Sequence, residues 1–289
     1  MRSVWLGAAL QALTTRSPLA LINGVIPADA CQVVQGVSYG RGPRQQLDIY
    51  IPWRAAGAPV VVFFYGGSWR SGARADYKFV GDALASRGYV TVIADYQLYP
   101  QAAYPDFLHD CAQAVAWAAQ HCAPYGGDPA RLYLVGHSAG AYNAAMLALD
   151  RRWLQAHGGS PAMLAGWVGM AGPYDFLPIQ TRTVRPVFHY PRTPADSQPV
   201  VHAHIGAPPA LLMAGSADSM VDPRRNTDGL AQALSAAKAD VQSIRYRGLG
   251  HEMLVGALAR PLRWRAPVLQ DLCAFLGKRR GAAIGLAQS

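Results

Sequence analysis

The pentapeptide GHSAG, residues 136–140, has the residue types that point most directly to chemistry. It matches the pattern G-x-S-x-G and lies between the apolar run RLYLVGH and the helical pattern AGAYNAAMLAL. A sharp turn from a strand into a helix holds a serine hydroxyl at the end of a sheet, and flanking glycines avoid clashes in that turn. The helix N-terminus also favours negative charge beside Ser138. The motif predicts that Ser138 is a nucleophile, with an ordinary glycine-rich turn as the alternative.

A serine hydroxyl is a weak nucleophile, so it needs a base, and the base needs an acid that orients it. Both follow the serine in the order Ser, Asp, His. Asp218 comes just beyond the apolar run at 209–215, and His251 comes just beyond the next strand pattern. Asp222 directly precedes Pro223 and is predicted to cap the following helix instead. We therefore predict catalytic roles for Ser138, Asp218 and His251.

The stretch FFYGGSW, residues 63–69, breaks an apolar run with two glycines. Acyl transfer develops negative charge on a carbonyl oxygen, and backbone N–H groups must point at that oxygen. Glycine lets a backbone approach a substrate closely because it has no Cβ. We predict an oxyanion hole formed by the N–H groups of Gly67, Ser68 and Ala139, with a simple β-turn as the alternative.

The other candidate ligands and thiols carry weaker signals. His137, beside the serine, is predicted to pack in the sheet. His189, His202 and His204 lie in the irregular stretch 173–208, where a metal pair and a surface or pocket-lining role are both open. The cysteines show no CxxC pair and are predicted to be free thiols: Cys31, Cys111, Cys122 and Cys273. The predicted mechanism needs no metal and no cofactor.

The elements that position these residues follow from the hydrophobic pattern. From about residue 45, short β-rich runs alternate with helical patterns, which is typical of a mostly parallel sheet. Strand-length runs occur at 46–52, 59–65, 89–96, 131–137, 164–172, 209–215 and 241–248. Helical patterns occur at 76–87, 105–122, 222–239 and 264–276. We predict an α/β fold with about eight strands flanked by helices, and a small cap at 173–208.

Length and composition favour one compact domain over residues 1–289. The formal charge is +9, but the basic residues are scattered, so a nucleic-acid partner is not expected. No apolar run reaches the length of a membrane span. The expected partner is a small-molecule substrate, and the oligomeric state is left open.

The N-terminal segment, residues 1–44, has two interpretations. VWLGAALQAL after Arg2, with ADA at 28–30, is similar to a signal peptide, which would mean export. The preferred interpretation is an N-terminal helix that packs on the protein or lies on its surface, and the segment 1–44 is a candidate cover for the active-site mouth. That interpretation predicts a cytoplasmic protein.

Six segments together resemble a known family. The chain from about residue 45 to 255 resembles α/β-hydrolase esterases of the hormone-sensitive-lipase-like group and relatives, including kynurenine formamidases and prenylcysteine methylesterases. The segments are YGGSW, DYQLYP, YPDFLHDCAQAVAW, YGGDPARLYLVGHSAGA, GSADSMV and GHEM. The resemblance implies Ser138 as nucleophile, His251 as general base and Asp218 as its orienting acid. It also implies Gly67, Ser68 and Ala139 as oxyanion donors.

The sequence departs from that family at two places. Tyr65 stands where the family's His-Gly-Gly-Gly motif has its histidine, and Gln97 stands where the family often has arginine. Backbone donors survive such changes, whereas the rigidity of the loop and the substrate preference depend on them.

We predict a serine carboxylesterase that hydrolyses small or short-acyl esters through an acyl-enzyme intermediate. An arylformamidase acting on N-formylkynurenine is one alternative, because its Gly-Gly-x-Trp loop is shared here through Trp69. A non-catalytic hydrolase-like binding module is the other. Substrate contacts are predicted for Trp69, Tyr174 and Phe188, with Phe176 and Tyr190 as further aromatic candidates.

Overall fold

The computed structural model describes Asn23 and residues 31–277, and its centre is one eight-stranded sheet. The strand order is β1-β2-β4-β3-β5-β6-β7-β8. β2 pairs antiparallel with β1 and with β4, and the other neighbours pair in parallel. The prediction of a mostly parallel sheet of about eight strands is confirmed. The strands are β1 Cys31–Ser38, β2 Gln46–Pro52, β3 Ala58–Phe64, β4 Val90–Ala94, β5 Gly127–His137, β6 Leu164–Met170, β7 Ala210–Gly215 and β8 Val241–Tyr246.

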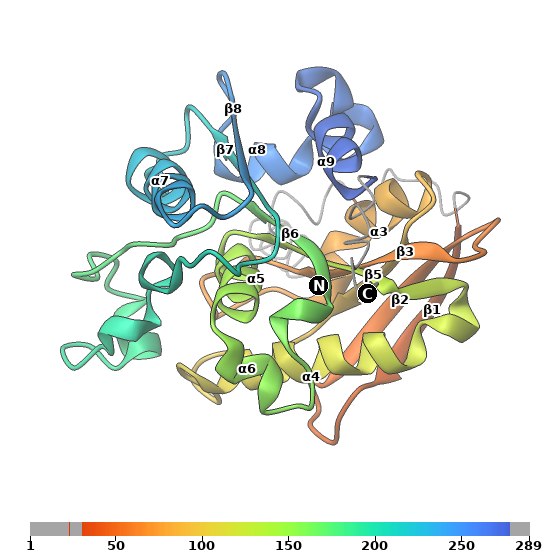
Figure 1. Cartoon of the computed structure of the whole chain (residues 1–289), viewed down its shortest axis with the longest axis horizontal. Helices are drawn as coiled ribbons and strands as arrows, with labels where there is room; N and C mark the ends of the chain where they lie inside the picture. Colours follow the sequence, from red (N-terminus) through yellow and green to blue (C-terminus); the bar gives the residue numbers. More distant parts are fainter. Residues whose placement is uncertain (1–22, 24–30, 278–289) are drawn as a thin grey trace, which may run out of the picture.

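Helices cover both faces of this sheet. The ribbon places α3 and α9 on one side and α4, α5 and α6 on the other, with α7 beside the β7–β8 end (Figure 1). Parallel strands need crossover connections, and helices commonly supply them. The helices are α3 Lys78–Ala85, α4 Asp106–His121, α5 Ala139–Leu149, α6 Arg151–Gln155, α7 Gly229–Ala236, α8 His251–Gly256 and α9 Val268–Leu276.

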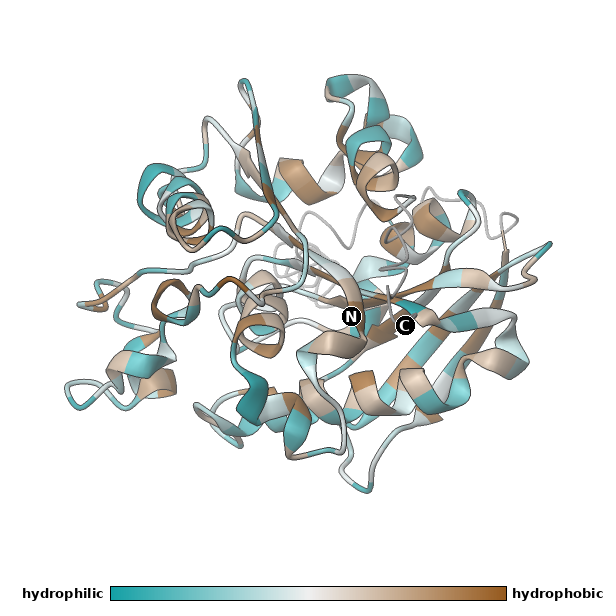
Figure 2. Ribbon diagram, in the orientation of Figure 1, coloured by the Kyte–Doolittle hydropathy of each residue, from teal (hydrophilic) through white to brown (hydrophobic). Residues whose placement is uncertain are grey.

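The core lies along the central strands and α5. Every residue of β4, β7 and α5 is buried. Figure 2 shows α5 as hydrophobic over most of its length, whereas α4 carries hydrophobic and hydrophilic residues in turn. A helix that is apolar on all sides must be covered on all sides, and α5 therefore lies inside the molecule, between the sheet and the segments packed over it.

Several boundaries differ from the sequence-based predictions. Strand β1 and helix α8 were not predicted. β1 is largely exposed at the sheet edge and shows no clear alternation, and α8 is only six residues long. The closing helix begins at Val268 instead of residue 264, because Pro267 breaks the pattern and residues Arg260–Arg265 form a 3₁₀ turn. The helix predicted for 222–239 opens with a π-helical turn, Arg224–Asp228, before α7.

The stretch 173–208 forms three 3₁₀ turns, Arg185–Phe188, Ala195–Ser197 and Pro199–His202, without a strand or an α-helix. Side-chain hydrogen bonds are among the contacts that attach it to the sheet domain. The Asn226 side-chain oxygen accepts the backbone N–H groups of Tyr174 and Asp175 at 2.7 and 2.9 Å. The Tyr142 hydroxyl on α5 donates to the Ser197 carbonyl at 2.7 Å. The insertion is therefore fixed over α5.

The predictions for residues 1–44 fall only partly on residues that the structure describes. The proposed helix and the alternative signal peptide fall on residues 1–30, which lie outside the described part except for Asn23. Residues 31–44 form β1 and the turn after it, and none of them lines the candidate cavity described below. The expectation that residues 1–44 cover the site stays a prediction. No helix among the described residues has both the length and the apolarity to cross a membrane.

Candidate active site

Ser138 occupies the sharp turn between β5 and α5. Its backbone φ is 55° and its ψ is −121°, a strained conformation for a residue with a Cβ. The turn is tight because α5 starts at the next residue and approaches β3 closely. A Cβ on Gly140 would lie 2.0 Å from the Phe64 carbonyl oxygen, so only glycine fits there. The local sequence thus forces the Ser138 hydroxyl outward at the carboxyl end of the sheet.

The structure brings Ser138, His251 and Asp218 together from three separate segments. His251 Nε2 lies 2.8 Å from Ser138 Oγ, and His251 Nδ1 lies 2.7 Å from Asp218 Oδ2. Ser138 follows β5, Asp218 follows β7, and His251 is the first residue of α8 after β8. Parallel strands deliver these segments to one edge of the sheet because their carboxyl ends all lie there. The geometry is that of a hydroxyl held by a base, with the base held by a carboxylate.

Asp218 is held in its ionised form. Burial of the carboxyl group favours the neutral acid, but hydrogen bonds from His251 and from two backbone N–H groups outweigh it and lower the pKa. The N–H groups are those of Met220 and Val221, each 2.9 Å from Asp218 Oδ1. Asp222 instead accepts the N–H of Arg224 at 2.9 Å, which agrees with its predicted capping role.

The glycine-rich segment after β3, residues 65–72, is called the oxyanion loop below. Gly67 has φ 128°, and a Cβ there would lie 2.2 Å from the Ser71 carbonyl oxygen, so the loop requires glycine at this position. Among the described residues, the N–H groups of Gly67, Ser68 and Ala139 have no hydrogen-bond acceptor. Ser68, Ser138 and Ala139 line the same cavity. The loop therefore offers unused donors beside the serine.

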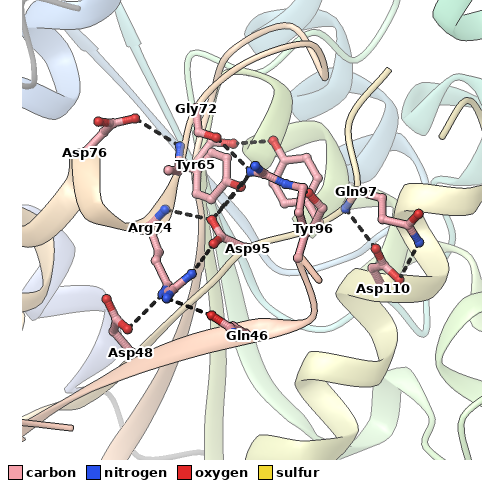
Figure 3. A network of polar contacts seen from close by, with 12 residues as sticks. Gln46, Asp48, Tyr65, Gly72, Arg74, Asp76, Asp95, Tyr96, Gln97 and Asp110 are labelled. Carbon is pink, nitrogen blue, oxygen red and sulfur yellow. Dashed lines mark hydrogen bonds and ion pairs between the residues drawn. The ribbon is translucent and has the colours of Figure 1, made fainter. Parts of the chain in front are cut away.

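Tyr65, the first departure from the family pattern, ties this loop to a buried polar network (Figure 3). Its hydroxyl donates to Asp95 Oδ1 at 2.8 Å and accepts from Arg44 at 2.7 Å. Arg44 also donates to the Gly72 carbonyl at 2.8 Å. Arg74 pairs with both Asp95 and Asp48. Tyrosine thus holds the start of the loop, and Arg44 holds its end.

Gln97, the second departure, lies in the same region of Figure 3 but has a different partner. Its backbone N–H donates to Asp110 Oδ2 at 2.8 Å. Gln45 donates to the other oxygen of Asp110, also at 2.8 Å. The buried Asp110 carboxylate is therefore satisfied by amide groups at this position.

A cavity of about 290 Å³ opens beside Ser138 and His251. Its lining includes an apolar group, called the aromatic wall below, that consists of Trp69, Phe176, Ile179 and Val184, and it also includes Met220, Val221 and the charged residues Asp175, Asp222 and Arg225. Residues from the insertion 173–208 thus do form part of the cavity.

Trp69 lines this cavity as predicted, but Tyr174 and Phe188 do not. Tyr174 and Phe188 are fully buried, Tyr174 against Trp167 and Phe188 against Trp69, so the prediction that they contact substrate is wrong. Trp69 packs edge-on against Phe188 at 4.8 Å between ring centroids and donates to Asn143 at 3.0 Å. An aromatic side chain that is already surrounded by rings supports the wall and offers no surface to a ligand.

The three histidines of the stretch 173–208 each bond a backbone group. His189 and His202 bond backbone carbonyls, those of Tyr104 and Asp196, and His204 accepts the N–H of Gly206. No group of three or more potential metal ligands occurs within the described ranges. All four cysteines are free, as predicted.

His137 is buried, as expected, but it also contacts the base. Its Nε2 lies 3.2 Å from the His251 carbonyl oxygen, and its Nδ1 lies 3.3 Å from the Tyr77 hydroxyl. Burial and the neighbouring His251 lower the pKa of His137 to about 3. The ring is therefore neutral in the folded protein at neutral pH.

We expect this buried neutral ring to make stability depend on pH. The unfolded chain binds a proton at His137 below its ordinary pKa of about 6.5, and the folded chain does not until about pH 3. Stability contributed by His137 is therefore complete above about pH 6.5 and is lost as the pH falls towards 3, at up to about 1.4 kcal/mol per pH unit. Urea unfolding at pH 7 and pH 5 measures the change, and His137→Gln should flatten it. An equal slope in both proteins would contradict this assignment; the ionisation of Asp218 affects only lower pH.

The fold and the strand-to-helix serine turn with its His and Asp partners define an α/β-hydrolase. A truncated carbohydrate esterase from gut microbiota has the same fold, with a TM-score of 0.73 at 18% identity over 87% of this chain and 99% of that one. Residues 47–234 match the BD-FAE family model, and the chain belongs to the BD-FAE family.

Two curated relatives extend the similarity beyond that range. A probable isoprenylcysteine alpha-carbonyl methylesterase, ICMEL2 of Arabidopsis thaliana, is 30% identical over 80% of this chain and 60% of its own length. Esterase LipC of Mycobacterium tuberculosis is 29% identical over 78% of this chain and 61% of its own length. The chain thus spans less than two thirds of the length of either relative.

Three residues near the site were missed as functional candidates. Tyr77, Asn143 and Arg44 contact His137, Trp69 and the oxyanion loop, respectively. Asn143 lies five residues after Ser138 in an otherwise apolar helix, and that lone polar residue was a usable signal. Tyr77 and Arg44 are in unremarkable polar stretches, and nothing in their sequence context marks them.

Proposed function

We propose that the chain is a serine carboxylesterase that hydrolyses small or short-acyl esters. The observation that carries this proposal is the continuous hydrogen-bonded arrangement of Ser138, His251 and Asp218 beside a cavity with unused N–H donors. The relatives named as esterases support the same reaction class.

The proposed reaction has two halves. His251 takes the proton of Ser138 Oγ as that oxygen attacks the ester carbonyl carbon. The N–H groups of Gly67, Ser68 and Ala139 receive the negative charge on the carbonyl oxygen. His251 then gives the proton to the departing alcohol, which leaves an acyl group on Ser138. Water, deprotonated by His251, releases the acid and restores the serine.

The aromatic wall is an argument for substrates with a short acyl chain. Trp69 belongs to the oxyanion loop and is only 2% exposed. Phe107, Tyr142 and Phe188 fill the space behind it. An acyl chain that extends beyond the cavity on this side would have to displace packed rings, which costs several kcal/mol in a close-packed interior.

The test compares initial rates on p-nitrophenyl acetate, p-nitrophenyl octanoate and N-formylkynurenine in one buffer. We expect acetate to be hydrolysed faster than octanoate, and both esters faster than the formamide. Dominant turnover of N-formylkynurenine would replace the proposal with an arylformamidase. No turnover of any of the three, together with no labelling of Ser138 by a fluorophosphonate, would leave a binding module.

The wall makes a specific prediction about chain length. Phe176→Ala removes a ring that lines the cavity and packs 5.2 Å from Phe188. We expect the octanoate-to-acetate ratio of kcat/KM to rise by at least about ten-fold, because several methylene groups gain room. Tyr190→Ala is the control, since Tyr190 is an exposed ring of the same insertion and does not line the cavity. Equal ratios in both variants would show that the acyl chain lies elsewhere.

A further inference from the structure

A line of buried hydrogen bonds runs from the oxyanion loop to the backbone of His251. The N–H of Gly66 lies 3.3 Å from the Tyr77 hydroxyl, and that hydroxyl lies 3.3 Å from His137 Nδ1. His137 Nε2 then lies 3.2 Å from the His251 carbonyl oxygen. Tyr77, His137 and His251 are all less than 8% exposed. Water therefore has little access to this line, and the groups must satisfy one another.

The chemistry of the two ends determines the direction of every bond. The His251 carbonyl can only accept, so His137 Nε2 carries a proton and donates it. In the neutral ring Nδ1 is then an acceptor, and it receives the Tyr77 hydroxyl proton. The Gly66 N–H can only donate, and the Tyr77 oxygen accepts it. Each donor thus has one acceptor, and the line has a single consistent arrangement.

This line joins the two parts of the site that must keep a constant spacing. Gly66 immediately precedes the proposed donors Gly67 and Ser68, and His251 is the proposed base. His251 follows a loop of four residues, 247–250, whose Gly248 and Leu249 bond to Ser216 and Ala217 after β7, so these bonds do not reach the oxyanion loop. Tyr77 is anchored on the other side, because it ends the 3₁₀ turn Arg74–Tyr77, whose Arg74 pairs with Asp48 and Asp95.

We propose that His137 and Tyr77 are positioning residues that set the distance between His251 and the oxyanion loop. They touch neither the substrate nor the reacting atoms in the proposed reaction. This inference rests on the proposed function, because it assigns no reaction of its own. Misplacing a catalytic group by about 1 Å can cost about a hundred-fold in rate, so the effect of losing the line is measurable.

Two substitutions of His137 separate the two ends of the line. His137→Gln can place an amide N–H near the position of Nε2 and turn its amide oxygen towards the Tyr77 hydroxyl, so both bonds of the ring can persist. His137→Asn can place an amide oxygen near Nδ1 and accept from Tyr77, but its side chain ends short of His251. Tyr77→Phe removes the bonds to both Gly66 and His137. Thermal melting verifies that each variant is folded.

The measurements are kcat and KM on p-nitrophenyl acetate and the second-order rate of Ser138 labelling by a fluorophosphonate. We expect His137→Asn to lower kcat and the labelling rate by about 10- to 100-fold, with KM within about two-fold. His137→Gln should stay within about five-fold of wild type, and Tyr77→Phe should lower both rates by at least about five-fold. Tyr77→Phe leaves the His137 side chain in place. The inference therefore stays testable if His137→Asn does not fold.

The outcomes separate this inference from the proposed function. Wild-type protein that resists labelling and hydrolyses no ester would overturn the proposed function and, with it, the positioning role. The positioning role alone would be overturned if the wild type is labelled and active and His137→Asn is as fast as the wild type. It would also be overturned if His137→Gln is as slow as His137→Asn. A rise in KM that accounts for the whole loss would also overturn it, since it would indicate a disturbed cavity.

Discussion

Ser138→Ala is expected to lower kcat on p-nitrophenyl acetate by about a million-fold, with little change in stability. Removing the serine of such an arrangement leaves only the background rate that the oxyanion donors and substrate binding provide. Alanine keeps the Cβ that Ser138 already carries at φ 55°, so the turn gains no new strain. Steady-state kinetics of freshly purified variant, corrected for spontaneous hydrolysis, measure the loss.

Ser86→Ala is the matched control. Ser86 is exposed at the end of α3, where its hydroxyl donates to the Ala83 carbonyl, and it lies outside the candidate site. Its activity should equal that of wild type within about two-fold. If Ser138→Ala kept more than about one per cent of the wild-type rate, the nucleophile would have to be another residue.

Asp218→Asn should give the second largest effect, a fall in kcat of about ten-thousand-fold. The Asp218 carboxylate accepts the Nδ1 proton of His251 and so leaves Nε2 free to take the serine proton. An amide can donate to Nδ1 and favour the opposite tautomer, which cannot act as a base. It also removes the negative charge that stabilises the imidazolium formed during the reaction. Its kcat is measured on p-nitrophenyl acetate at neutral pH.

Asp222→Asn tests whether catalysis requires the carboxylate of Asp218 and not that of Asp222. Both residues belong to the loop after β7, and an asparagine at 222 can still accept the N–H of Arg224. We expect less than about a ten-fold loss of activity. A larger loss for Asp222→Asn than for Asp218→Asn would reverse the two assignments.

Much of the fold could be predicted because local patterns of apolar residues indicate where strands and helices lie. The continuous apolar runs at 59–65 and 209–215 are β3 and β7, which are buried on both faces of a parallel sheet. The edge strand β1 was missed because five successive residues of it are exposed, so it shows no period of two. The start of α9 was placed four residues early because the 3₁₀ turn before Pro267 has helix-like spacing.

The cavity wall was predicted less well than the arrangement of Ser138, Asp218 and His251. Four aromatic residues of the insertion were expected to face substrate. Of these four, Phe176 lines the cavity beside Trp69, whereas Phe188 packs behind Trp69. An irregular segment has no period that separates its inner side from its outer side, so composition alone could not distinguish these two phenylalanines.

By itself, the sequence determined the order of most strands and helices, the serine turn and the residues Asp218 and His251 that follow it. These depend on short-range properties: the period of apolar residues, the small size of glycine and the turn chemistry at strand ends. The tertiary structure alone decided that Tyr65 holds the oxyanion loop through Asp95 and that Tyr77 and His137 join this loop to His251. Those contacts link residues 11 to 114 positions apart, and hydrogen bonds at such separations depend on how the packed elements meet in space.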